Sequence, residues 1–130
     1  MRVVLDASVA VHALIPGPLR AAAHARLAGM EAVAPALVDT EVLSALARLE
    51  RGGALSTAEA DAAAQAWTQF PCDRLHDERL MARIWALRAR LRVADAHYVA
   101  WANALDLPLL TADGRLARAV GPGTTVMLVQ

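Results

Sequence analysis

The side chains best placed to do chemistry in this sequence are carboxylates that follow predicted strands. Asp6 comes directly after the apolar run Val3-Val4-Leu5, and Asp113 lies two residues beyond Thr111, where a run from Pro108 ends. A strand that leads into a helix brings such a residue to the carboxyl edge of a parallel sheet. Either aspartate could instead cap the helix that follows it by accepting backbone N–H bonds. The repetition of the arrangement favours one shared site over two unrelated caps.

Further acidic candidates lie on predicted helices. Asp95 falls in the first turn of one helix, beside an apolar stripe that includes Tyr98 and Val99. The helix dipole favours a carboxylate at this position, so Asp95 could also serve the helix alone. Asp39 and Glu41 lie at opposite edges of the apolar stripe of an earlier, long helix, and periodicity does not choose between them.

Several carboxylates that converge without a lysine would repel one another strongly. A hard divalent cation relieves that repulsion, and all-oxygen ligands favour Mg²⁺ or Mn²⁺. Such an ion polarises a phosphoryl oxygen and generates hydroxide from bound water, and a second ion could stabilise the leaving oxygen. This is the chemistry of phosphodiester hydrolysis, and it needs no nucleophilic side chain.

Alternating strands and helices are expected to position these acids. Strands are predicted at residues 2–6, 31–34, 71–76, 108–111 and 125–129. Helices are predicted at residues 8–15, 19–28, 35–52, 56–69, 77–91, 94–105 and 113–120. Pro35 is expected to start the helix at 35–52, and a capping box from Ser56 to Glu59 the helix at 56–69. The alternation predicts an α/β fold with a mainly parallel sheet covered on both faces. The length of 130 residues allows one domain, residues 1–130.

Composition excludes several other classes of protein. The chain is 57% hydrophobic, which excludes intrinsic disorder, and its single Cys72 excludes a disulfide scaffold and suits a reducing compartment. The 13 basic residues, all arginine, balance 13 acidic ones, so any nucleic acid must be bound locally rather than by a basic coat. Asp6 and His12 interrupt the N-terminal apolar run, and no apolar stretch is long enough to span a membrane. We therefore expect a cytoplasmic protein without membrane contact.

Most other conspicuous side chains are expected to serve structure. The histidines lack metal-ligand spacing; they are His12, His24, His76 and His97. The tryptophans are expected in the core or at an interface; they are Trp67, Trp85 and Trp101. We expect a group of arginines to lie on a solvated helix face, with phosphate contact as the alternative role; they are Arg83, Arg88, Arg90 and Arg92. Arg115 and Arg118 follow Asp113 and are the nearer candidates for contact with a nucleic-acid phosphate.

Four short segments, taken together, resemble the PIN-domain family and, within it, the VapC-type ribonuclease toxins of bacterial toxin–antitoxin pairs. They are Val3-Val4-Leu5-Asp6-Ala7-Ser8, Glu41-Val42-Leu43-Ser44-Ala45-Leu46, Ala94-Asp95-Ala96-His97-Tyr98-Val99-Ala100, and the segment from Pro108 to Ala117. The resemblance spans essentially the whole chain. It implies a three-layer α/β/α sandwich, Mg²⁺- or Mn²⁺-dependent endoribonuclease activity on RNA, a homodimer, and a cognate antitoxin that covers the site.

The resemblance also implies roles for individual residues, and it selects Glu41 rather than Asp39. Asp6 and Asp95 would hold the principal metal ion. Glu41 would act directly or through water, and Asp113 would serve a second ion or orient water. Ser8 and Thr111 match hydroxyl positions that support the site. Val93 and Ala94 depart from the family, which often has a hydroxyl residue before the third acid, so the supporting hydrogen bond of that hydroxyl is not expected.

Other functions were weighed against the same residues. A dinucleotide-binding fold would need a glycine-rich loop after the first strand, which this chain lacks. Receiver domains and haloacid-dehalogenase-type phosphotransferases also end their first strand in aspartate, but both families use a lysine, and none is present. Two alternatives stay open: a DNA nuclease of the same fold, and a PIN-like scaffold that binds proteins without catalysis. The presence of all four acids disfavours the scaffold.

Overall fold

The protein forms a five-stranded parallel sheet between layers of helices. The computed structural model describes residues 1–130, and its strands are β1 (Arg2–Leu5), β2 (Glu31–Pro35), β3 (Cys72–Leu75), β4 (Leu109–Thr111) and β5 (Val126–Leu128). Their order across the sheet is β3-β2-β1-β4-β5, and every neighbouring pair is parallel. The predicted α/β class with a parallel sheet is therefore confirmed.

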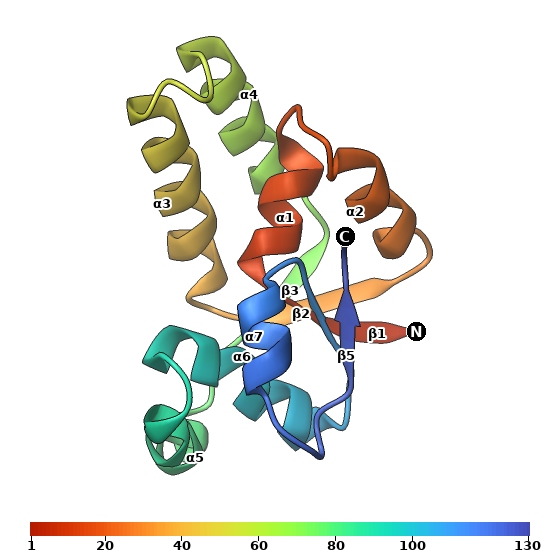
Figure 1. Cartoon of the computed structure of the whole chain (residues 1–130), viewed down its shortest axis with the longest axis vertical. Coiled ribbons are helices and arrows are strands. Elements are labelled where there is room, and N and C mark those ends of the chain that lie inside the picture. The colour runs from red at the N-terminus through yellow and green to blue at the C-terminus, as the bar shows by residue number, and fades with distance from the viewer.

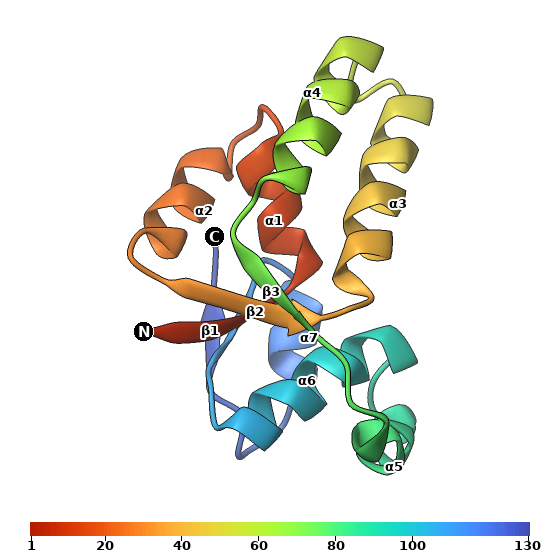
Figure 2. The same cartoon turned by 180° about the vertical axis from the view of Figure 1, so that it is seen from behind.

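Helices cover both faces of this sheet. They are α1 (Ala7–Leu14), α2 (Arg20–Leu27), α3 (Val38–Arg51), α4 (Thr57–Thr68), α5 (Met81–Ala86), α6 (Val93–Leu105) and α7 (Gly114–Ala119), with 3₁₀ turns η1 (Glu78–Leu80) and η2 (Leu87–Ala89). Helices α1 to α4 gather on one side of the sheet and α5 and α6 on the other (Figure 1), and the view from behind shows the same division (Figure 2). None of the helices combines the length and hydrophobicity needed to cross a membrane.

The centre of the sheet is fully enclosed. Val3, Val4 and Leu5 of β1 and Leu109 and Leu110 of β4 have no exposed surface. Strands that are buried on both faces read as continuous apolar runs rather than alternating ones, which is the pattern of β1. The fully buried centre of the sheet thus lies directly beneath the two strand-to-helix corners that carry Asp6 and Asp113.

The strand order places those corners side by side. From β1 the chain moves outward to β2 and β3, and it then returns to place β4 on the opposite side of β1. Such a reversal opens a crevice at the carboxyl ends of the two central strands, where open α/β sheets bind ligands. Asp6 follows β1 and Asp113 follows β4, so the fold brings both to this crevice.

The start of the third helix was predicted wrongly. Pro35 is the last residue of β2, opposite Leu75 of β3, and α3 begins only at Val38. Proline lacks an N–H group, but the pairing of β2 with β1 covers only Glu31 to Val33, so no sheet hydrogen bond to β1 is lost at Pro35.

The continuous helix predicted over residues 77–91 was also wrong. The chain there forms η1, α5 and η2, and Asp77 caps the first turn by accepting a hydrogen bond from the Arg79 N–H. Ile84 and Leu91, which are seven residues apart, are nevertheless both buried, as positions on one face of a helix would be. The two tighter 3₁₀ turns keep these side chains in the core while the chain bends toward α6.

Candidate active site

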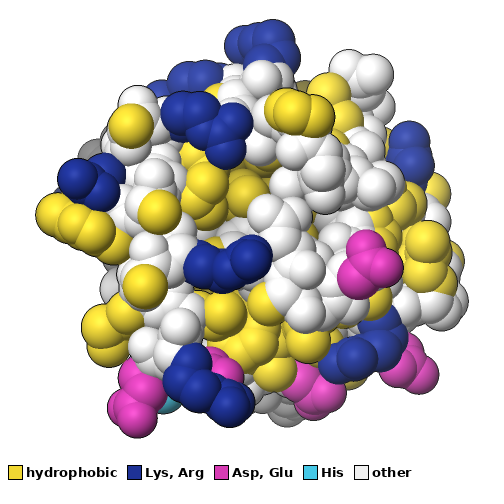
Figure 3. Space-filling model, turned by 90° about the horizontal axis from the view of Figure 1, so that it is seen from below, with side chains coloured by type: hydrophobic (Ala, Val, Ile, Leu, Met, Phe, Trp, Pro, Cys, Tyr) yellow, Lys and Arg dark blue, Asp and Glu magenta, His cyan; other side chains and the backbone are white.

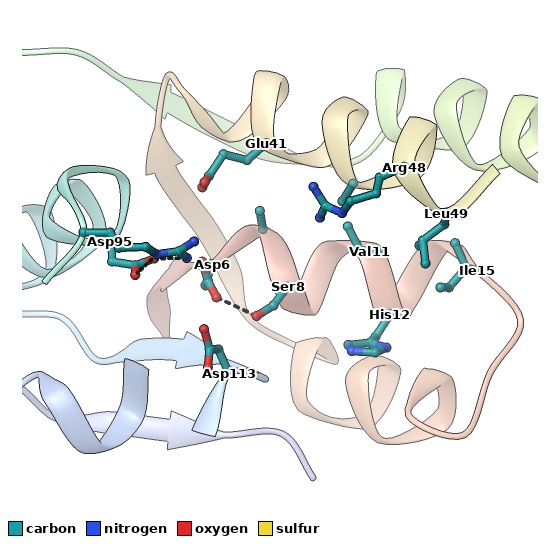
Figure 4. Close-up of a pocket in the computed structure, with 13 residues that line it drawn as sticks. Asp6, Ser8, Val11, His12, Ile15, Glu41, Arg48, Leu49, Asp95 and Asp113 are labelled. Atoms are coloured by element: carbon teal, nitrogen blue, oxygen red, sulfur yellow. Dashed lines mark hydrogen bonds and ion pairs between the residues drawn. The ribbon is translucent and has the colours of Figure 1, made fainter. Parts of the chain in front are cut away.

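An open pocket of about 340 Å³ lies at the carboxyl ends of β1 and β4. Its lining includes all four of the predicted acidic residues, Asp6, Glu41, Asp95 and Asp113. Figure 4 shows their carboxylates approaching one space from different elements: Asp6 from the end of β1, Glu41 from α3, Asp95 from α6 and Asp113 from the start of α7. The fold therefore gathers residues that are up to 107 positions apart in the sequence (113 minus 6).

Asp6 is the most enclosed of the four. It occupies the N-cap position of α1, yet its side chain makes no capping hydrogen bond, and the residue is only 6% exposed. Instead, one carboxylate oxygen accepts hydrogen bonds from the hydroxyls of Ser8 (2.5 Å) and Thr111 (2.8 Å). Burial raises the pKa of Asp6 to about 6; the two hydroxyls counteract this shift, and the nearby Glu41 and Asp95 add to it. The site thus holds a carboxylate that is poorly compensated for its loss of water.

The two hydroxyls that contact Asp6 are themselves fixed by the backbone after β4. Ser8 Oγ accepts a hydrogen bond from the Ala112 N–H, and Thr111 Oγ1 accepts one from the Asp113 N–H. These bonds tie the β1–α1 corner to the β4–α7 corner across the crevice. The orientation of the Asp6 carboxylate is therefore determined by both strands.

Asp95 lies in the first turn of α6, as predicted, and is 7% exposed. The Arg92 guanidinium donates to both of its carboxylate oxygens, from Nε at 2.9 Å and from Nη2 at 3.2 Å. Arg92 also lines the pocket, and the pairing raises its pKa. This arginine offsets the negative charge at one side of the site.

Glu41 and Asp39 have different surroundings, although both belong to the first turn of α3. Glu41 lines the pocket and accepts a 2.6 Å hydrogen bond from the hydroxyl of Tyr98, whose side chain is completely buried. Asp39 instead accepts hydrogen bonds from the Trp67 indole (2.8 Å) and the Arg74 guanidinium (2.9 Å). Only Glu41 is placed with the other acids.

Asp113 is a helix cap as well as a pocket residue. Its Oδ1 accepts hydrogen bonds from the backbone N–H groups of Arg115 (2.9 Å) and Leu116 (3.2 Å) at the start of α7. Its Oδ2 lies 3.5 Å from the Arg115 guanidinium. Asp113 therefore has one oxygen engaged with its own helix.

The donor set fits a divalent cation. The pocket lining offers four carboxylates and the Ser8 hydroxyl, all of them oxygen groups of the kind that Mg²⁺ and Mn²⁺ prefer, and the buried Thr111 hydroxyl supports Asp6 from outside the lining. The carboxylates share the pocket but do not form a preformed cluster of three at metal-ligand spacing. The raised pKa of Asp6 shows that its negative charge is poorly stabilised in the folded chain, and a bound cation would supply the missing stabilisation.

The other predicted contact residues lie further from this space. Arg115 and Arg118 are exposed and do not line the pocket. His97 hydrogen-bonds the Val93 carbonyl through Nδ1 (2.7 Å) and lines a different cavity. Trp85, which was expected in the core or at an interface, is 61% exposed with the Arg88 guanidinium stacked over it.

Sequence reasoning placed none of four residues that hold or line the site, and it named one of them, Arg92, only within a helix-face group with phosphate contact as the alternative. Arg92 and Tyr98 hold Asp95 and Glu41, while His12 and Arg48 line the end away from the acids. Helical spacing carried the signal for two of them: Arg92 is three residues before Asp95, and Arg48 is seven residues, about two turns, after Glu41. The contact between Tyr98 and Glu41 joins two separate helices, so no local sequence pattern could predict it.

Comparison with known proteins agrees with this geometry. A sequence model of the PIN domain matches residues 3–122 of the chain. The chain belongs to the PIN-domain family. Ribonuclease VapC3 of Mycobacterium tuberculosis is 47% identical over 119 residues, which cover 91% of this chain and 87% of that protein. Ribonuclease VapC12 of the same species is 36% identical over 127 residues, 98% of each chain.

Structural comparison gives the same fold. The crystal structure of VapBC2 from Rickettsia felis bound to a promoter DNA fragment contains a chain that matches with a TM-score of 0.71. The match covers 100% of both chains at 13% sequence identity. At that identity the match bears on the fold alone, and it agrees with the α/β/α PIN architecture.

Proposed function

We propose that this PIN-domain protein is a metal-dependent endoribonuclease, the toxin of a toxin–antitoxin pair. The observation that carries the proposal is the pocket in which Asp6, Glu41, Asp95 and Asp113 converge. The VapC ribonucleases to which the chain is similar supply the substrate class, RNA. The reaction is hydrolysis of a phosphodiester bond by water.

Asp6 and Asp95 are the proposed ligands of the principal Mg²⁺ or Mn²⁺ ion. Asp6 is desolvated and has only hydroxyl partners, so a cation is the compensation that it lacks. Asp95 binds Arg92, which keeps its carboxylate at the pocket wall. When bound, the ion supplies Lewis-acid chemistry, polarising a phosphoryl oxygen and making water a nucleophile at neutral pH.

The remaining acids orient water or assist the cation. Glu41 is proposed to act directly or through water, and the Tyr98 hydroxyl fixes one of its oxygens. Asp113 is proposed to serve a second ion or to orient water with the oxygen that its helix does not use. Ser8 and Thr111 are proposed to hold Asp6 in position, and Arg115 and Arg118 to guide RNA from the exposed side of α7.

The chain is proposed to form one PIN domain over residues 1–130 and to assemble as a homodimer. It is proposed to act in the cytoplasm, without membrane contact, and to be inhibited by an antitoxin protein. Large apolar side chains with at least 47% exposure offer contact surfaces on α3, α5 and α6; they are Leu43, Met81, Trp85 and Val93. The single Cys72 is free, in keeping with a reducing compartment. Light scattering on the purified chain measures the oligomeric state directly.

The function is tested by mapping new 5′ ends in total RNA incubated with purified protein and Mn²⁺. Discrete ends should arise with the wild type and vanish with a chelator or with Asp95→Asn. Asp39→Asn is the matched control, because it removes a carboxylate from α3 that contacts Trp67 and Arg74 outside the pocket; it should cut like the wild type. New RNA ends that persist in the chelator would refute the proposal of a metal-dependent ribonuclease. The same holds if no RNA is cut while duplex DNA is.

A further inference from the structure

The pocket has a second end that the proposed hydrolysis does not use. Beyond the carboxylates, the lining continues with Val11, His12, Ile15, Ala45, Arg48 and Leu49. In Figure 4, His12, Ile15, Arg48 and Leu49 occupy the side of the pocket farther from Asp95 and Asp113. These six residues define the distal end of the pocket.

Two helix faces build the distal end as a continuation of the acidic site. On α1 and its C-cap residue Ile15, the lining residues Ser8, Val11, His12 and Ile15 recur at the spacing of a single helix face. On α3, the same holds for Glu41, Ala45, Arg48 and Leu49. Both faces begin beside a residue of the acidic site and run for seven residues or more. At 1.5 Å of rise per residue, the groove extends about 10 Å beyond the carboxylates.

The chemistry of the distal end is that of a nucleotide site. Val11, Ile15 and Leu49 give it an apolar wall, as flat bases require. Arg48 is exposed at its rim, and the four ion pairs of the structure involve other arginines: Arg74, Arg79, Arg92 and Arg115. A guanidinium without an acidic partner can bind a phosphate bidentately or stack on a base.

His12 adds a polar group to the same wall. It is partly buried, and loss of solvent lowers its pKa, so the ring is neutral at physiological pH and can donate or accept a hydrogen bond. Arg48 is therefore the only charged group of the distal end. One face of the protein shows arginines scattered between hydrophobic and acidic side chains rather than joined in a basic surface (Figure 3).

We infer that the distal end binds the nucleotide next to the cleaved bond of a single-stranded RNA. Arg48 contacts its phosphate, and its base lies against Val11, Ile15 and Leu49 with His12 at its edge. The inference rests on the proposed ribonuclease function and adds a substrate subsite to it. The occupant follows from continuity with the acidic pocket and from the unpaired charge of Arg48, which complements a phosphate.

Binding of a short fluorescein-labelled single-stranded RNA of mixed sequence, followed by fluorescence anisotropy over a range of KCl concentrations, tests this inference. All variants carry Asp6→Asn, so that the probe is not cut. Adding Arg48→Ala should weaken binding about tenfold, the value of one charged hydrogen-bonded contact. It should also reduce the slope of log K against log salt by about 0.7, one phosphate contact to a single strand.

Arg51→Ala is the matched control, because Arg51 is an exposed arginine of the same helix that does not line the pocket. It should leave affinity and salt slope nearly unchanged. His12→Ala should weaken binding several-fold without altering the slope, since it removes no charge. Equal effects of Arg48→Ala and Arg51→Ala would overturn the subsite, as would an Arg48→Ala protein that binds RNA normally but no longer binds its antitoxin.

A separate cleavage assay distinguishes failure of the subsite from failure of the proposed function. If the wild type makes metal-dependent cuts in RNA and only the Arg48 effect is missing, the subsite alone is wrong. If the wild type neither cuts nor binds RNA, the ribonuclease proposal falls and the subsite falls with it.

Discussion

The corners after β1 and β4 are similar in sequence, yet their aspartates are held in opposite ways. Each corner follows an apolar strand and starts a helix. Asp113 caps its helix through two backbone N–H groups, whereas Asp6 makes no capping bond and points its carboxylate to the hydroxyls of Ser8 and Thr111. An aspartate at a helix start is therefore available for chemistry when other groups, not the helix, determine its orientation.

Burial extends this contrast. Asp6 is 6% exposed, and its pKa is raised by loss of solvent, while the Asp113 side chain is 28% exposed and partly compensated by its helix. Changes at Asp6 should therefore affect activity and metal binding most strongly. Changes at Asp113 should divide between stability and activity.

The largest effect is expected from Asp6→Asn. Removing the buried charge should lower RNA cleavage by about 10³-fold, the size of a strong electrostatic contribution to catalysis. The chain should still fold, because the substitution relieves carboxylate repulsion. Cleavage rates and circular dichroism, measured side by side with Asp113→Asn, check this; equal losses in the two variants would remove the distinction between the corners.

The stability of the metal-free protein should depend on pH through Asp6. The pKa of this group is 3.8 when unperturbed and about 6 in the folded chain, so the folded state binds the proton more tightly. Its contribution to stability is therefore complete below pH 3.8 and is lost as pH rises through 6, a difference of about 3 kcal/mol. Urea unfolding in chelator should show this loss in the wild type but not in Asp6→Asn, and Mn²⁺ should restore stability to the wild type at neutral pH.

An intermediate effect is expected from the hydroxyls that orient Asp6. Thr111→Val removes the 2.8 Å hydrogen bond to the carboxylate and the acceptor for the Asp113 N–H, with little change in shape. Loss of a group that orients a metal ligand typically costs 10- to 100-fold in metal affinity or activity. Titration with Mn²⁺ should show weaker binding, and unchanged affinity would mean that burial alone positions Asp6.

The smallest effect is expected at the capping corner. Asp113→Ala removes both backbone hydrogen bonds at the start of α7 and should cost about 1 kcal/mol of unfolding free energy. Asp113→Asn keeps a side-chain acceptor and should retain that stability while it loses part of the activity. Chemical denaturation of the two variants separates capping from charge; equal stabilities would show that the cap contributes little.

Local patterns in the sequence were enough to predict much of this arrangement. The apolar runs predicted the strands, and Ser56 and Glu59 form the predicted capping box with reciprocal hydrogen bonds. The two strand-then-aspartate corners predicted that Asp6 and Asp113 would meet at one edge of the sheet, whereas the choice of Glu41 came from the family resemblance. Residues 77–91 were predicted as one helix, and Ile84 and Leu91 do face the core at helical spacing, but such spacing does not reveal the 3₁₀ turns on either side of α5.

Contacts between distant segments explain what periodicity left open. Asp39 and Glu41 are equivalent on a helical wheel, and their difference arises from Trp67 and Arg74 on one side and Tyr98 on the other. The orientation of Asp6 depends in the same way on Thr111, 105 residues away. No local pattern encodes such pairs, because they form only when the sheet has assembled.

A Mn²⁺ titration followed by electron paramagnetic resonance tests whether the β1–α1 corner holds the metal ion. Wild type, Asp6→Asn and Asp113→Asn would be compared without RNA. The structure predicts that Mn²⁺ binding is lost in Asp6→Asn and retained, at most weakened, in Asp113→Asn. Full binding by Asp6→Asn together with loss in Asp113→Asn would contradict this assignment and place the metal at the other corner.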